Sequence, residues 1–255
     1  MEDQINFESR IDFTDLNEKI TRIRERMGMV IIGQREVADL LLTAMLADGH
    51  ILIEGVPGIA TPLMAKVMAR ILDVPFNRIQ FTPDLMPSDI LGTSVFLPAA
   101  GRFEYRKGPI FSNIVLVDEI NRAPAKTQAA LFEVMEERQI TNDGVEYRMD
   151  YPFVVVGTQN PIEHEGTYRL PEAQLDRFLF KINVTYPSVA EEIEVLELHD
   201  HGAIAHWQEL EPVLSVEALK KLRAQVAQVR VDPKIKSFIV NIVDATRKSG
   251  WLYLG

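Results

Sequence analysis

Five short apolar segments constrain the fold of this chain more than any other feature of its sequence. Residues 51–54, 78–81, 114–119, 153–158 and 178–184 are bounded by turn residues, and their apolar residues are mostly consecutive rather than alternating. Consecutive apolar residues are typical of strands covered on both faces, as in a parallel sheet with crossover helices. Amphipathic, helix-like stretches lie between them at 35–48, 62–72 and 125–138. The pattern predicts an α/β fold.

Two segments interrupt this alternation, and a third changes it. Residues 94–108 and 138–152 each place turn residues between short strand-like runs, which predicts two hairpins inserted in the α/β core. After residue 186 the strands stop, and 191–199, 215–229 and 233–247 have helical patterns. These last segments predict a small helical second domain.

The first apolar run leads into a candidate phosphate-binding loop. Such a loop directs backbone N–H groups at phosphate oxygens from a helix N-terminus, adds a Lys for charge, and adds a Ser or Thr hydroxyl for Mg²⁺. The candidate nucleotide-binding residues are Gly55, Val56, Pro57, Gly58, Ile59, Ala60, Thr61 and Pro62.

Two residues of this loop depart from what phosphate binding needs. Thr61 stands where the Lys is expected, and Pro62 stands where the hydroxyl residue is expected. A positive charge, a backbone N–H and a metal-ligating oxygen are lost together, and each charge-assisted contact contributes about 1.5–3 kcal/mol. We expect nucleotide affinity to fall by a few powers of ten. Taken alone, the segment also fits an ordinary strand–turn–helix corner.

Polar residues lie at the ends of three of the other strands. Asp118 and Glu119 end the 114–119 run, where one carboxylate suits the Mg²⁺ shell and the other suits activation of water. Asn160 follows the 153–158 run and can position that water, although an Asn-Pro turn is the plainer interpretation. Arg177 precedes the last strand, where it can reach a neighbouring subunit's phosphates or form an intrachain salt bridge to Asp176 or Glu172.

Composition narrows the function classes. The net charge is -10, with 27 basic and 37 acidic residues, which argues against general attraction to nucleic acid. There are no cysteines, so disulfides and thiolate metal sites are excluded. The polar N-terminal sequence has no signal-peptide pattern, and no apolar run has the length of a membrane span. These features predict a cytoplasmic protein.

Together, these segments resemble the MoxR family of AAA+ ATPases, in the clade with a helix-2 insert. The resemblance rests on "RIQFTPDLMPSDILGT", "IVLVDEINRAPAKTQAALFEVMEERQIT" and "VVGTQNPIEHEGTYRLPEAQLDRFLFKI", and extends over 31–255. It implies a P-loop NTPase-type αβα sandwich with a five-stranded parallel sheet and a helical lid. It also implies a ring, usually a hexamer, that binds ATP and Mg²⁺ and remodels protein clients, some with von Willebrand factor A-domain partners.

The resemblance also implies domains and roles. A helical extension is expected over 1–30, the nucleotide-binding domain over 31–186 and the lid over 187–255. Asp118 matches the Walker B acid that holds Mg²⁺ through water, and Glu119 matches the catalytic glutamate. Asn160 matches the first sensor, and Arg177 matches the arginine finger. Walker A matches Gly55, Gly58 and Ala60, and Gly33-Gln34 lies where adenine is approached.

Two departures from the family leave two functions open. The family has Lys-Thr where this chain has Thr61-Pro62, and a chain ending at Gly255 lacks the lid's second sensor arginine. One hypothesis is a chaperone-like motor that hydrolyses ATP; the other is a pseudo-ATPase that serves as a non-hydrolysing assembly subunit of a ring. A nucleic-acid ring motor is a third hypothesis, which the acidic charge disfavours.

Overall fold

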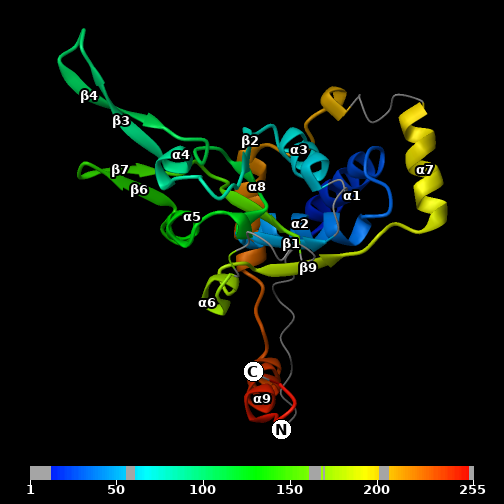
Figure 1. The fold of residues 1–255 in the computed structure, drawn as a ribbon. Helices are drawn as coiled ribbons and strands as arrows, with labels where there is room; N and C mark the ends of the chain where they lie inside the picture. Colours follow the sequence, from blue (N-terminus) through cyan, green and yellow to red (C-terminus); the bar gives the residue numbers. More distant parts are fainter. Residues whose placement is uncertain (1–12, 56–60, 161–167, 169, 201–206, 253–255) are drawn as a thin grey trace. The chain divides into compact units, whose positions relative to one another are not determined.

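The computed structural model describes residues 13–55, 61–160, 168, 170–200 and 207–252. Contacts divide the chain into a large unit, Phe13–Arg223, and a small unit that contains Ala224–Gly255. Figure 1 traces both units in sequence colours. The domain boundaries expected at residues 31 and 187 stay predictions.

The large unit is built on a five-stranded parallel sheet, which confirms the α/β prediction. Its strand order is β2-β5-β8-β1-β9. The strands are β1 (Ile51–Gly55), β2 (Phe76–Gln80), β5 (Ile114–Asp118), β8 (Val154–Gln159) and β9 (Phe180–Val184). The three central strands, β5, β8 and β1, are almost wholly buried, as their consecutive apolar residues predict.

Helices cover both faces of this sheet. Alternate strand residues divide between two apolar clusters: Ile114 and Leu116 belong to one, and Val115 and Val117 belong to the other. The first cluster includes side chains of α1 (Thr14–Gly28), α2 (Arg35–Ala47) and α3 (Thr61–Ile71). The second includes those of α4 (Pro87–Leu91) and α5 (Ala125–Glu137). The three layers follow from the period-two alternation of strand side chains.

The two inserted segments form hairpins that lie side by side (Figure 1). One consists of β3 (Gly92–Leu97) and β4 (Arg102–Lys107), and the other of β6 (Gln139–Asn142) and β7 (Val145–Arg148). Ser94 Oγ donates to Asp143 Oδ2 and accepts from Asn142 Nδ2, both at 2.7 Å. The rings of Tyr105 and Tyr147 lie 4.4 Å apart. Contacts between side chains therefore join the two hairpins.

Further helices complete the described chain. They are η1 (Ile120–Arg122), α6 (Glu172–Leu175), α7 (Val189–Asp200), α8 (Val216–Ala227) and α9 (Pro233–Lys248). The boundary between the two units falls within α8, whose Leu219 and Leu222 belong to the core of the large unit. The α9 helix begins after Asp232, which caps it by accepting from the Lys234 backbone N–H at 2.8 Å. Within the described residues, no helix combines the length and apolarity needed to cross a membrane.

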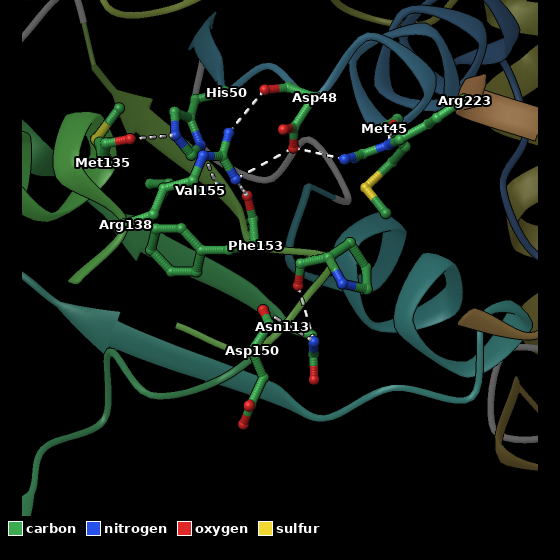
Figure 2. Close-up of polar contacts among 11 residues, drawn as sticks. Met45, Asp48, His50, Asn113, Met135, Arg138, Asp150, Phe153, Val155 and Arg223 are labelled. Carbon is green, nitrogen blue, oxygen red and sulfur yellow. Dashed lines mark hydrogen bonds and ion pairs between the residues drawn. The ribbon is translucent and has the colours of Figure 1, made fainter. Parts of the chain in front are cut away.

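A buried histidine lies at the edge of the sheet where the strands begin (Figure 2). His50 precedes β1, and its Nδ1 accepts from the Val155 backbone N–H at 2.9 Å. Its Nε2 therefore carries the proton, which it donates to the Met135 carbonyl at 3.1 Å. Burial is the largest effect and lowers the pKa of His50 to about 4. The hydrogen bond to Met135 acts in the opposite direction, and the smaller effects of Arg138 and Asp48 lower and raise the pKa, respectively.

Two arginines meet at Asp48 beside this histidine (Figure 2). Arg138 follows α5 and donates to the Asp48 carbonyl at 2.8 Å and the Phe153 carbonyl at 3.0 Å. Arg223 of α8 forms an ion pair with Asp48 Oδ1 at 2.5 Å and donates to the Met45 carbonyl at 2.6 Å. Asp48 thus connects the ends of α2 and α5 to α8.

Candidate functional site

The candidate phosphate loop lies between β1 and α3. Gly55 is the last residue of β1, and Thr61 and Pro62 are the first two residues of α3. Thr61 is buried, with 6% of its surface exposed. The loop residues between them, Val56, Pro57, Gly58, Ile59 and Ala60, lie outside the described residues. The two atypical residues therefore occupy the helix N-terminus at which a phosphate would be expected.

Asp118 and Glu119 lie at the carboxyl end of β5. One strand separates β5 from β1, the strand that leads to the loop. Strand β8 lies between β5 and β1 and supplies Thr158. Thr158 Oγ1 donates to Asp118 Oδ1 at 2.5 Å and accepts from the Glu119 backbone N–H at 3.0 Å. One threonine on β8 thus fixes both predicted acidic residues.

Arg78 is the cation partner of Asp118. It comes from β2, next to β5 in the sheet, and donates to Asp118 Oδ2 from Nη2 at 2.5 Å and from Nε at 3.2 Å. Its Nη2 also contacts Gln80 Oε1 at 3.1 Å. The Asp118 side chain is 17% exposed, while that of Arg78 is 49% exposed. Asp118 is thus shielded on one side by protein, with a solvent-accessible guanidinium on the other.

Glu119 has a strained backbone and its own partners. Its φ of 55° and ψ of 50° lie in the left-handed region, which is costly for a residue with a Cβ and is common at functional sites. Glu119 Oε2 accepts from Gln80 Nε2 at 3.0 Å and pairs with Arg122 Nε at 3.1 Å. Gln80 and Arg122 therefore fix the orientation of the Glu119 carboxylate through one of its oxygens.

Glu54 completes the polar edge, next to the start of the loop. Its Oε2 pairs with Lys181 of β9 at 2.8 Å, and its Oε1 accepts from Gln159 of β8 at 2.5 Å. Burial acts to raise the pKa of Glu54, but the hydrogen bonds from Lys181 and Gln159 outweigh it and hold the pKa below its ordinary value. Asn160, the predicted water-positioning residue, directly follows Gln159 and β8.

Gly33 and Gln34 border a separate pocket of about 510 Å³, formed by the start of α2 with α1 and α7. Gly33 has a φ of 71°, and a Cβ built on it would lie 3.0 Å from Glu191 Cδ, so the site favours glycine. Gln34 is 6% exposed, and among the described residues its Oε1 has no hydrogen-bond partner. The pocket is of ligand size, and one unpartnered acceptor is buried in the residues that line it.

Arg177 is directed at helix α5. It forms an ion pair with Glu136 and donates to the Phe132 carbonyl at 3.3 Å. The intrachain partner is thus Glu136, whereas the sequence suggested Asp176 or Glu172. Arg177, Asp176 and Glu136 line a hollow of about 350 Å³. The contacts of Arg177 are thus separate from those of the acidic pair.

Sequence reasoning missed four residues that hold the acidic pair: Arg78, Gln80, Arg122 and Thr158. One signal was available for two of them. Arg78 and Gln80 alternate in the predicted 78–81 strand, so they share one face, and the register places Gln80 opposite Asp118. Recognising this contact requires knowing that β2 and β5 are neighbours.

The described residues do not fit the expected magnesium site. Mg²⁺ binds through one or two carboxylates together with phosphate oxygens and water, and the loop hydroxyl is a usual ligand. Here Pro62 has no hydroxyl, and both Asp118 oxygens accept hydrogen bonds from Arg78 and Thr158. Among the described residues there is no cluster of three or more acidic or histidine side chains suited to a metal. Instead, positively charged side chains of the protein pair with Asp118 and Glu119.

Comparisons with known proteins agree with this geometry. The family model for ATPases associated with various cellular activities (AAA) matches residues 50–180. The uncharacterized protein YeaC of Bacillus subtilis is 48% identical over 241 residues, which is 94% of this chain and 75% of YeaC. Chaperone MoxR1 of Mycobacterium tuberculosis is 46% identical over 86% of this chain and 57% of its own length. Protein MoxR of Methylorubrum extorquens is 28% identical, over 93% and 71%.

A solved structure shows the same fold. The crystal structure of an ATPase candidate from Cytophaga hutchinsonii superimposes with a TM-score of 0.82 at 43% identity. The match covers 90% of this chain and 69% of that one.

Proposed function

Because the chain belongs to the MoxR family of AAA+ ATPases, we propose that it is a chaperone-like ring protein that remodels protein complexes, with a weakened ATP site of its own. The observation that carries this proposal is the acidic pair Asp118–Glu119, which Thr158 holds at the sheet edge near the loop. A strained glutamate beside a fixed aspartate suits activation of water at a γ-phosphate.

The other predicted site residues take roles in the same proposal. Gly55 and the loop after it, to Pro62, would receive the phosphates, and Asn160 would orient water from the end of β8. The pocket at Gly33 and Gln34 would receive adenine. Arg177 would act in trans, since its contacts lie on α5 rather than at the acidic pair.

The assembly and the setting belong to this proposal as well. MoxR1 is named a chaperone, and by likeness to it we expect protein clients. From the resemblance to the MoxR family we expect von Willebrand factor A-domain proteins among them. We further expect a homo-oligomeric ring, a hexamer, located in the cytoplasm. The chain spans 57% of the length of MoxR1 and 75% of the length of YeaC. We therefore propose, rather than conclude, the activity of the whole protein.

A non-hydrolysing subunit is the second candidate, and two observations favour it. Both oxygens of Asp118 are engaged by protein donors, and Pro62 lacks the hydroxyl that a metal would need. In a mixed ring, such a subunit could still supply Arg177 to a neighbour with an intact loop. The two candidate functions require the same fold and differ only in whether the protein hydrolyses ATP.

Titration of the protein with ATP by isothermal calorimetry, with and without Mg²⁺, tests these candidates. We expect weak binding, with a dissociation constant of about 0.1–1 mM, because the loop lacks its Lys and hydroxyl. Phosphate release measured in the same samples separates the two functions. Tight binding with turnover would rule out the non-hydrolysing subunit, and a folded protein that binds no ATP would rule out the ATPase.

A further inference from the structure

The acidic edge of the sheet is balanced by cations of the protein. Asp118 pairs with Arg78, Glu119 pairs with Arg122, and Glu54 pairs with Lys181. Each of these carboxylates of the described edge thus has a positively charged partner within 3.1 Å. A nucleotide site built around a metal would instead leave charge for the metal to neutralise.

Arg78 stands out among these cations by its geometry. Its guanidinium makes two hydrogen bonds to one oxygen of Asp118, and Thr158 donates to the other oxygen. Charge-assisted hydrogen bonds of this kind are among the stronger polar contacts. A cation that approaches Asp118 from solvent therefore has to compete with the exposed Arg78 side chain.

Arg78 also connects the two acidic residues to each other. Its Nη2 contacts Gln80 Oε1 at 3.1 Å, and Gln80 Nε2 contacts Glu119 Oε2 at 3.0 Å. The three strands β2, β5 and β8 thus contribute to one continuous polar network. Displacement of Arg78 would free Asp118 Oδ2 and remove one support of the Gln80 side chain that contacts Glu119.

We propose that Arg78 is the resident counter-ion of Asp118 and excludes divalent cations from this carboxylate. This role of Arg78 concerns the proposed nucleotide site and rests on the proposed function. It assigns Arg78 a positioning and regulatory role: the guanidinium neutralises the aspartate in a chain whose loop offers no hydroxyl at Pro62. Metal loading then requires Arg78 to leave Asp118.

Titration of the whole chain with Mn²⁺ alone, followed by electron paramagnetic resonance, tests this role without nucleotide. The Arg78→Gln variant should bind Mn²⁺ about fivefold more tightly than the unmodified protein, a factor that corresponds to an exposed ion pair at the upper end of its usual strength. The Arg78→Lys variant keeps the positive charge and should stay close to the unmodified protein. Adding Asp118→Asn to Arg78→Gln should remove the gain.

The matched control is Arg106→Gln, which removes the same charge from the exposed strand β4. It should leave Mn²⁺ binding unchanged. If Arg78→Gln does not fold, Arg78→Met keeps the apolar stem and carries the same expectation. Unchanged Mn²⁺ affinity in the neutral variant, or a gain that survives Asp118→Asn, would overturn the proposal.

The proposed function can fail separately. Absence of ATP binding in calorimetry would leave the Mn²⁺ comparison intact, because that comparison uses only the metal and the protein. Conversely, ATP binding with unchanged Mn²⁺ affinity would refute the role of Arg78 and leave the nucleotide site in place.

Discussion

Replacing Thr61 by Lys and Pro62 by Thr is expected to raise the affinity for ATP by about two to three powers of ten. The change restores a positive charge, a backbone N–H and a hydroxyl at the N-terminus of α3, where the phosphates would lie. Two restored contacts of about 1.5–3 kcal/mol each are enough for this gain, since about 1.4 kcal/mol corresponds to tenfold. Isothermal calorimetry of the double variant and the unmodified protein measures it.

The single variants are the matched controls for this repair. Thr61→Lys alone restores the charge, and Pro62→Thr alone restores the N–H and the hydroxyl, so each should give part of the gain. Thr61 is buried, so the folded state of every variant is checked by circular dichroism. A folded double variant with unchanged affinity would contradict the idea that these two residues weaken the site.

Acidification is expected to destabilise the protein through His50 by about 3 kcal/mol. Folding lowers the pKa of this side chain from 6.5 to about 4, chiefly by burial, so the unfolded state binds a proton more readily than the folded state. The stabilisation by neutral His50 is therefore fully present above pH 6.5, and it is lost as the pH falls from 6.5 to about 4. Each pH unit in this window corresponds to about 1.4 kcal/mol.

Urea unfolding at several pH values measures this effect by comparison with His50→Asn. The amide can still accept from the Val155 N–H, but it does not titrate, so the variant should show a shallower loss of stability on acidification. His199→Gln, on the exposed part of α7, is the control and should keep the steep dependence. Equal pH dependence in His50→Asn and the unmodified protein would exclude His50 as the cause.

The parallel sheet could be predicted from the sequence because its central strands are buried on both faces. Consecutive apolar residues at 114–117 and 153–156, bounded by turn residues, are typical of such strands. The outer strand β2 was less clear: the prediction began at residue 78, whereas the strand begins at Phe76. It is an edge strand of the described sheet, paired with β5, and it carries polar residues, so its apolar signal is weak.

The cross-strand partners of the acidic pair, Arg78, Gln80 and Thr158, could not be predicted, because they depend on strand order, whereas Arg122 lies only three residues after Glu119. Arg78 and Thr158 lie on strands at opposite sides of β5, and nothing local to either residue indicates this arrangement. The network at His50 has the same cause, since Arg223 and Asp48 meet only when α8 packs beside α2. The sequence identified the acidic residues by their position after a strand, whereas their hydrogen bonds follow from tertiary pairing.

The two joined hairpins have a mechanical consequence. The first hairpin continues directly from α4, and the second follows α5 after one residue, while Thr127 of α5 donates to the Leu85 carbonyl just before α4 at 2.7 Å. Thus α5 is bonded to the residue just before α4, where the hairpins begin. The hairpins themselves are joined by the hydrogen bond of Ser94 with Asp143 and by the ring contact of Tyr105 with Tyr147. A force on the tip of either hairpin would therefore be transmitted to both α4 and α5. The two hairpins would move together as one rigid unit rather than independently.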